Sequence, residues 1–329
     1  MQLRTLGLVV HGGKPRAVEA AGVARAWAAR CGVACADIDV WSEDGRHSAA
    51  EEAARAGHPE LVVTIGGDGT FLRGARIAMA GGAAVLGVDV GRVGFLTVVE
   101  ADDLTEALDA VLHDRFEIDE RLALTLCASR PLAIPPGIEA LLRYGRGPAL
   151  PPPLVRERVG GDPDVGVPLD IRALNDVVFE KLARDRQASV AIYVDGRRFV
   201  SYSADAVIVS TPTGSTAYSF AAGGPVLSPA LAGLVLTPVA PHMSFNRSLV
   251  LAREQRVAVQ VLERSGQVAV SVDGALRGVL DPGDWVSVHA DPTGARLVRL
   301  GEVDFLGRVR TKLGLADAAA ALADSGEAG

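Results

Sequence analysis

The sequence predicts an α/β N-terminal domain built on a parallel sheet, followed by a β-rich, sandwich-like C-terminal domain. With 329 residues, the chain has room for two domains of the usual ~100–200 residues. Over residues 1–120, apolar runs alternate with Ala-rich stretches, a pattern typical of the βαβ units of a Rossmann-like sheet. From about residue 121 the helical patterns fade, and short β-branched runs separated by turn signals take over.

The N-terminal elements are expected in strand–helix order. Apolar runs predict buried strands at residues 6–10, 61–65 and 84–88. Good helix formers at 16–29, and a further helical stretch at 71–79, predict the helices between them. Strands that alternate with helices indicate a parallel sheet covered on both faces.

The second domain is expected to span residues 121–299 and to consist of many short strands. Apolar runs place these strands at 122–126, 177–180, 190–194, 206–210, 257–262, 268–272 and 285–289. The dipeptides Asp195-Gly196 and Asp273-Gly274 mark turns between them. Residues 131–168 hold nine of the 18 prolines, which predicts an exposed, semi-rigid loop with no core of its own.

Composition and charge argue against several classes of protein. The formal charge is −7, the pI is about 5.4 and aromatic residues make up 5%, which disfavours a nucleic-acid binder. No apolar stretch approaches the ~18–20 residues that span a bilayer, and the N-terminus lacks the order of a signal peptide. Three cysteines cannot build a disulfide framework, and six scattered histidines show no metal-ligand spacing. We expect a cytoplasmic protein with no resident metal site and no membrane or nucleic-acid partner.

A glycine-rich turn, GGDGT at residues 66–70, follows the second predicted strand. Its glycines let backbone N–H groups approach an anion, and the helix after it offers its positive end to a phosphate. Asp68 would repel that phosphate unless it performs chemistry, such as accepting a hydroxyl proton. The alternative is a tight turn in which Asp68 only caps the helix. The spacing matches neither a P-loop nor a dinucleotide fingerprint.

A second glycine-rich segment, STPTGSTAYSFAAGGP, occupies residues 210–225 and follows an apolar run. It offers hydroxyl and backbone donors, and Tyr218 could stack on a planar ring, which suits a nucleotide or sugar-phosphate ligand. Taken alone, the segment would equally fit a Ser/Thr-rich loop leading into a helix near 217–222.

Four segments occur together in order: GGDGTFLR at 66–73, GVDVGRVGFL at 87–96, ALNDVVFEK at 173–181 and STPTGSTAYSFAAGGP at 210–225. The combination resembles the NAD kinase family, the enzymes that phosphorylate the 2′-hydroxyl of NAD to make NADP. STPTGSTAY is the most specific part, whereas GGDGT is shared with diacylglycerol-type lipid kinases and phosphofructokinases. The resemblance implies an active site in the cleft between the domains, and a C-terminal segment, 300–329, that returns to the first domain.

The resemblance also implies roles for single residues. Asp68 would be the base that takes the proton from the ribose 2′-hydroxyl, with Gly67 and Gly69 against the bound nucleotide. Arg73, one helical turn further on, would reach a phosphate. The implied contacts to the dinucleotide in the second domain are Asn175 and Asp176 at the ribose and adenine, Arg186, Asp205 on the nicotinamide side, and Thr216, Ala217, Tyr218, Ser219, Phe220 and Ala221 along the glycine-rich segment.

The implied substrates are NAD and ATP, or polyphosphate, with Mg²⁺ carried in by the triphosphate, and the implied assembly is a homodimer or homotetramer. Two positions depart from the family pattern. Asp89 stands where many relatives have Asn, which places an extra carboxylate near the expected phosphates, and Ala275 stands where Gln is frequent. Two other functions stay open on these grounds: a lipid or small-molecule kinase that shares GGDGT, and a catalytically silent NAD(P)-binding regulator.

Overall fold

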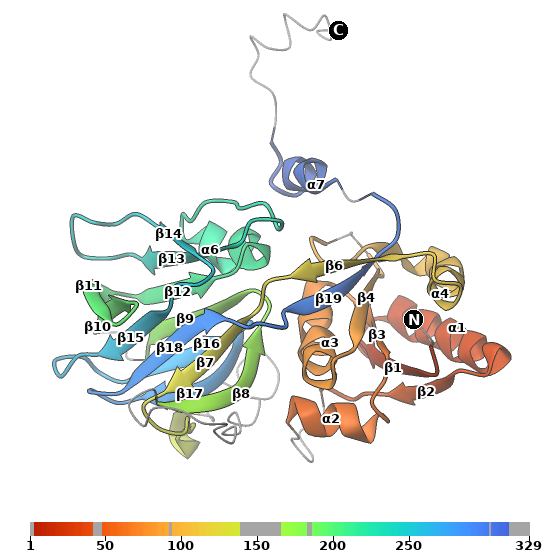
Figure 1. The fold of residues 1–329 in the computed structure, drawn as a ribbon, viewed down its shortest axis with the longest axis horizontal. Coiled ribbons are helices and arrows are strands. Elements are labelled where there is room, and N and C mark those ends of the chain that lie inside the picture. The colour runs from red at the N-terminus through yellow and green to blue at the C-terminus, as the bar shows by residue number, and fades with distance from the viewer. Residues whose placement is uncertain are drawn as a thin grey trace, which may run out of the picture.

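The computed structural model describes residues 3–41, 48–91, 94–138, 166–182, 186–302 and 304–315. They form an α/β domain beside a β-sandwich, with a last helix, α7, above the junction of the two (Figure 1). Within these residues, no helix is long and apolar enough to cross a membrane.

The first sheet has seven strands in the order β2-β1-β3-β4-β19-β6, with β5 paired to β4. Its strands are β1 (Thr5–Val10), β2 (Ala34–Asp37), β3 (Leu61–Gly66), β4 (Ala84–Asp89), β5 (Val99–Glu100), β6 (Glu117–Arg121) and β19 (Ala295–Arg299). All pairs are parallel except the outer pair of β6 and β19. The predicted parallel sheet is therefore confirmed.

Helices cover both faces of this sheet, as the unbroken burial of β3 and β4 requires. The helices are α1 (Pro15–Cys31), α2 (Ala49–Arg55), α3 (Asp68–Gly81), α4 (Leu104–Leu112) and the short 3₁₀ turn η1 (Ala101–Asp103). Alternate residues of β3 pack into the apolar clusters on the two faces of the sheet. Val63 packs with Trp27 of α1 and Leu108 of α4, whereas Val62 packs with Phe71 of α3.

The second domain packs two six-stranded antiparallel sheets face to face. One sheet, in the order β11-β10-β15-β18-β7-β8, contains β7 (Leu124–Ala128), β8 (Val167–Ala173), β10 (Ala188–Val194), β11 (Arg197–Ala204), β15 (Val257–Val261) and β18 (Trp285–Ala290). The other, in the order β14-β13-β12-β9-β16-β17, contains β9 (Asp176–Lys181), β12 (Ala206–Ser210), β13 (Gly233–Val239), β14 (Leu249–Ala252), β16 (Val268–Val272) and β17 (Ala275–Leu280). One apolar cluster, with Phe179 and Tyr202 among its members, fills the space between them. The predicted sandwich is therefore confirmed.

The two predicted Asp-Gly turns close hairpins of this sandwich. Asp195 and Gly196 have φ of 50° and 75°, and Asp273 and Gly274 have φ of 48° and 76°. Positive φ at both central residues defines the type I′ turn, whose twist matches the flanking strands.

Two segments differ from the sequence expectation. Residues 295–299, expected within the β-rich part, form β19 in the first sheet, because an apolar run does not specify which sheet it joins. In the proline-rich segment 131–168, Leu132 is buried in the sandwich core against Gly278, so the start of that segment does contribute to the core. Residues 139–165 lie outside the described residues, so the loop predicted there is not tested.

Candidate active site

Asp68 lies at the start of α3, where the glycine-rich turn leaves β3. Gly67 is the N-cap, and Asp68 is the first helical residue. Its carboxylate points to another segment, where Oδ2 accepts the N–H of Phe95 at 3.0 Å and Oδ1 accepts that of Leu96 at 3.1 Å. The alternative in which Asp68 caps its own helix is therefore wrong. The two amides instead fix the orientation of this half-buried carboxylate.

The segment that holds Asp68 leaves no room for a side chain at Gly94. A Cβ there would lie 1.9 Å from Asp68 Oδ1. Asp89 organises the same segment, since one oxygen accepts the N–H of Gly91 and the other accepts the hydroxyl of Thr97. Asp89 is buried and both of its oxygens are used inside the loop, so the departure from Asn is accommodated by local hydrogen bonds.

On the second domain, Asn175 and Asp176 lie where β9 begins, beside the Asp273-Gly274 turn. The Asp273 carboxylate accepts the backbone N–H groups of Asn175 and Asp176 on one oxygen and that of Leu174 on the other, at 2.7–3.1 Å. Asp273 sits at a hairpin tip, yet its carboxylate is enclosed. Sequence analysis saw Asp273 only as a turn residue and missed this role.

Burial dominates the electrostatics of this carboxylate pair. Burial, with Asp273 beside it, raises the pKa of Asp176 to about 7. Burial also raises the pKa of Asp273, to about 6, against the three amide donors that favour its charged form. Because only Asp273 has those donors, Asp176 is the carboxyl group that keeps its proton to the higher pH. In addition, Asn175 Oδ1 is buried without a hydrogen-bond partner among the described residues, which leaves an acceptor for a ligand.

The glycine-rich segment 210–225 is joined to Asn175. Thr211 donates its N–H to the Asn175 carbonyl at 2.8 Å and its hydroxyl to the Leu174 carbonyl at 2.6 Å. Gly214 comes so close that a Cβ there would lie 2.1 Å from the Asn175 carbonyl oxygen. The two motifs that were far apart in sequence therefore form one wall of the site.

The residues after Gly214 differ in accessibility. They form the 3₁₀ turn η3 (Thr213–Thr216) and the short helix α6 (Tyr218–Ala221). Tyr218, Phe220 and Ala221 are exposed, and Thr216 and Ala217 are half-buried. Ser219 is fully buried and its hydroxyl lies 2.9 Å from that of Thr237, so its contacts here are internal. The Tyr218 side chain is thus exposed, whereas Ser219 packs inward.

The remaining residues expected to bind the nucleotides are spread over both domains. The Arg73 guanidinium stacks 4.2 Å from the centre of the Trp41 ring and donates to the Val40 carbonyl. Asp205 forms an ion pair with Lys181. Arg186 and Gly69 are exposed, and Gly67 is half-buried.

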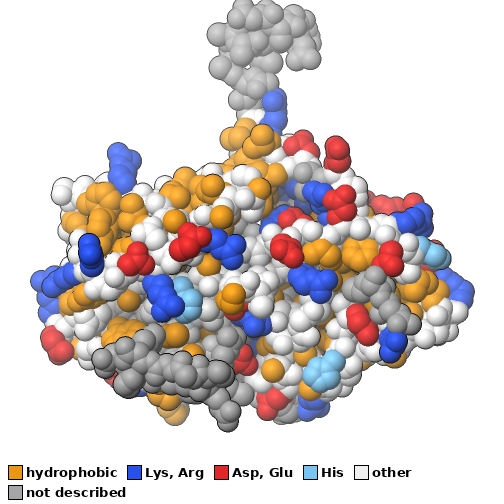
Figure 2. Space-filling model, viewed as in Figure 1, with side chains coloured by type: hydrophobic (Ala, Val, Ile, Leu, Met, Phe, Trp, Pro, Cys, Tyr) orange, Lys and Arg blue, Asp and Glu red, His pale blue; other side chains and the backbone are white. Residues whose placement is uncertain are grey.

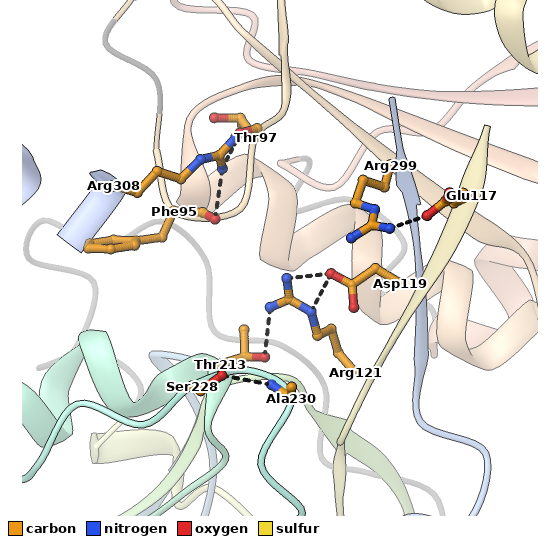
Figure 3. A network of polar contacts seen from close by, with 10 residues as sticks. All are labelled: Phe95, Thr97, Glu117, Asp119, Arg121, Thr213, Ser228, Ala230, Arg299 and Arg308. Atoms are coloured by element: carbon orange, nitrogen blue, oxygen red, sulfur yellow. Dashed lines mark hydrogen bonds and ion pairs between the residues drawn. The ribbon is translucent and has the colours of Figure 1, made fainter. Parts of the chain in front are cut away.

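Arginines that sequence analysis missed line the junction of the domains (Figure 3). Arg121 of β6 pairs with Asp119 and donates to the Thr213 hydroxyl at 3.3 Å, which links the first sheet to the glycine-rich segment of the second domain. Arg299 of β19 pairs with Glu117. Arg308, on α7 (Phe305–Lys312), donates to the carbonyls of Phe95 and Thr97. These residues cluster around a small pocket that Phe95, Arg121, Arg299 and Arg308 help to line.

A larger cavity, of about 490 Å³, opens at the carboxyl ends of β1 and β2. His11, Gly12, Asp39 and Trp41 are among the residues that line it, and His11 Nδ1 is buried with no hydrogen-bond partner in the described part of the chain. In the order β2-β1-β3 the connections diverge between β1 and β3, where α/β sheets bind ligands, so this cavity lies beside that switch point. Among the described residues, no group of three or more His, Cys, Asp or Glu side chains could hold a metal ion.

Comparison with known proteins agrees with this architecture. Residues 7–116 match the model of the ATP-NAD kinase N-terminal domain, and residues 174–300 match that of the C-terminal domain. The chain is 61% identical to NAD kinase 1 of Streptomyces avermitilis over 98% of its own length and 91% of that protein. It is 60% identical to NAD kinase 1 of Streptomyces coelicolor over 98% of its length and 89% of that relative.

Solved structures share the fold at lower identity. Yeast NADH kinase complexed with NADH aligns with a TM-score of 0.72 and 21% identity, over 97% of this chain and 89% of the yeast chain. An NAD kinase from Archaeoglobus fulgidus in complex with ATP aligns with a TM-score of 0.62 and 21% identity, over 94% and 96% of the two chains.

Proposed function

The chain belongs to the NAD kinase family, and from that premise we propose that it transfers the γ-phosphoryl group of ATP to the 2′-hydroxyl of the adenosine ribose of NAD, giving NADP. The observation that carries the proposal is the Asp68 carboxylate, held by the amides of Phe95 and Leu96 at the start of α3. Its position at the edge of the domain junction suits a general base for a sugar hydroxyl.

In this mechanism the ribose 2′-oxygen attacks the γ-phosphorus while Asp68 accepts the hydroxyl proton, and ADP leaves. Phosphoryl transfer depends mainly on positioning and on stabilising the charge of the transferred group. The two amides fix the direction of the Asp68 oxygens, and Arg121 supplies positive charge at the junction. ATP enters as its Mg²⁺ complex, so the metal is part of the substrate.

The acceptor side of the proposal rests on Asn175 and Asp176. The partnerless Asn175 Oδ1 can accept from a ribose hydroxyl or an adenine amino group. Asp176, which holds its proton up to about pH 7, can donate an O–H hydrogen bond to an acceptor on the ligand while it remains neutral. The exposed ring of Tyr218 offers a stacking surface beside them.

The donor side of the proposal rests on the cavity near His11 and Trp41. The Trp41 ring, already stacked with Arg73, gives a planar base a surface at the switch point next to the glycine-rich turn. Arg73 would then lie between that base and the phosphates, which agrees with the phosphate role predicted for it.

Two further properties belong to this proposal. Exposed hydrophobic side chains gather over the part of the sandwich that holds β13, β14 and α6 (Figure 2), among them Phe220, Leu231 and Val250. Since β14 is an edge strand, we propose that a second copy covers this surface in a dimer or tetramer. A light-scattering mass near that of one chain would contradict this. No disulfide joins Cys31, Cys35 and Cys127 in the described part of the chain, which supports a reducing, cytoplasmic location.

The experiment is a turnover assay with NAD or NADH as acceptor and with ATP–Mg²⁺ or polyphosphate as donor, run on the parent and on Asp68→Asn. NADP should form with the parent, and kcat should fall by at least ~10²–10⁴-fold in the variant with NAD binding retained. Phosphorylation of lipids instead of NAD in a labelled-ATP panel would favour the lipid kinase. Binding of NAD with no turnover by the parent would favour the silent regulator.

A further inference from the structure

The helix α7 is connected to the segment that holds Asp68 through the Arg308 side chain. Arg308 Nη1 donates to the carbonyl oxygens of Phe95 at 3.2 Å and Thr97 at 3.0 Å (Figure 3). The N–H of the same Phe95, and that of Leu96, bind the Asp68 carboxylate. One stretch of backbone is therefore held by Asp68 through its N–H groups and by Arg308 through its carbonyls.

Few other bonds fix this stretch. The Thr97 hydroxyl donates to Asp89 and accepts the N–H of Gly94, and the next anchor is the N–H of Val98 on the Gly87 carbonyl. These contacts tie its two ends to β4. The Phe95 carbonyl is held by Arg308, so loss of the guanidinium would leave the Phe95–Leu96 peptide held, among the described residues, only by the bond from its N–H group to Asp68.

The charges agree with a role beside Asp68. Burial lowers the pKa of Arg308, while the charge of Asp68 opposes that effect and the charge of Arg121 adds to it. Arg308 thus lies within electrostatic reach of both Asp68 and Arg121. Arg308 and Asp68 form no direct ion pair among the described residues, so the guanidinium does not cover the Asp68 oxygens.

The helix itself is a minor part of the hydrophobic core. Val309 is its one buried residue among those described, and Leu306 is 74% exposed. Asp304 caps the helix by accepting the N–H of Gly307, so the helix has its own local support. A role in folding of the whole chain is therefore a poor explanation for two hydrogen bonds across more than 200 residues.

We propose that Arg308 is a positioning residue for Asp68: it fixes the Phe95–Thr97 backbone, and that backbone sets the direction of the carboxylate that accepts the hydroxyl proton. The inference rests on the proposed function, because Asp68 must be the base for its direction to matter. It makes the last helix of the chain a functional part of the first domain's site.

The test compares Arg308→Gln, Arg308→Lys and a matched control on the same helix, Lys312→Gln, whose side chain is exposed. Arg308→Gln should lower kcat by about 10- to 100-fold with KM for NAD changed less than about 3-fold, because the base is displaced while the binding wall is intact. Arg308→Lys, which keeps a charged donor, should recover part of the loss. Lys312→Gln should behave as the parent.

A double-mutant cycle separates positioning from a general structural effect. In the Asp68→Asn background, Arg308→Gln should change the residual turnover by less than about 3-fold, because no base is left to position. Equal losses in both backgrounds, or a loss confined to KM for NAD, would overturn the inference. The parent and Asp68→Asn in the same assay decide the proposed function separately.

Hydrogen exchange gives a readout that does not depend on turnover. The amides of Phe95 and Leu96 should exchange faster in Arg308→Gln than in the parent, with protection in β3 and β4 unchanged. Unaltered exchange at those two amides would refute the inference even if activity fell. Faster exchange throughout the first domain would also refute it, since Arg308 would then support the fold rather than Asp68.

Discussion

Asp176→Asn should stabilise the protein at pH 8 and leave its stability at pH 4 almost unchanged. Asp176 is 4% exposed, and it lies beside the Asp273 carboxylate. Both burial and that neighbour penalise its ionised form. An amide of the same size cannot ionise, so the variant avoids the penalty wherever the parent must carry the charge.

The magnitude follows from the two ionisation states. In the unfolded chain Asp176 ionises near the ordinary pKa of ~3.9, whereas the folded protein holds the proton to about pH 7. Between these values the folded state binds more protons, so the free energy of unfolding falls as pH rises and stays low above pH 7. At ~1.4 kcal/mol for each pH unit of that window, the upper limit is about 4 kcal/mol, and we expect 2–4 kcal/mol at pH 8, on the order of that limit.

The assay is urea unfolding of the parent and Asp176→Asn at pH 4, 6 and 8, with Glu263→Gln as the control because Glu263 is exposed. The gain in stability of Asp176→Asn should grow with pH, while the control should follow the parent. A gain that is equal at all three pH values would refute the reasoning, since the effect would then not come from ionisation.

Three other substitutions test separate parts of the structure. Gly94→Ala should lower kcat by about 100-fold with folding retained, because the new Cβ would lie 1.9 Å from Asp68 Oδ1 and displace the carboxylate. Turnover equal to that of the parent would show that catalysis does not need the carboxylate in this position. Trp41→Ala should raise KM for ATP without raising KM for polyphosphate, because only ATP has a base to stack on the Trp41 ring. Equal effects on the two donors would show that the adenine of ATP does not bind in the cavity beside Trp41. Arg277→Met should raise the free energy of unfolding by about 1–3 kcal/mol, measured by denaturant titration. Arg277 is buried, and its Nε and Nη1 have no hydrogen-bond partner among the described residues.

The elements that the sequence predicted well are those fixed by local pattern. The strands expected at 61–65 and 84–88 are β3 and β4, because a run buried on both faces has few other ways to satisfy its backbone. Turns were likewise expected at both Asp-Gly pairs, and the structure adds that they are of type I′, with positive φ at both residues. The GGDGT turn placed Asp68 at a helix start for the same reason.

The contacts that the sequence could not predict are long-range. Arg308 reaches Phe95 across 213 residues, and Arg121 reaches Thr213 across 92. In a sequence, each arginine resembles an ordinary surface residue, because nothing near it specifies a partner. Residues 295–299 were assigned to the second domain with no strand expected there, for the same reason, since the pairing of β19 with β4 is decided by the fold as a whole.

Asp273 shows how one residue can satisfy a local rule and a distant one together. Asn is at least as suitable as Asp before Gly in a type I′ turn, so the turn alone does not explain the carboxylate. Both Asp-Gly turns use it: Asp195 accepts the N–H of Arg256 and the side-chain amide of Gln255, and Asp273 accepts three backbone N–H groups that start β9. An Asn at either place would turn an NH₂ group toward a donor, which costs a hydrogen bond and adds a repulsion. The choice of Asp over Asn in a hairpin turn is therefore a signal, readable in a sequence, that the turn holds a neighbouring strand, and at Asp273 that strand carries Asn175 and Asp176 into the site.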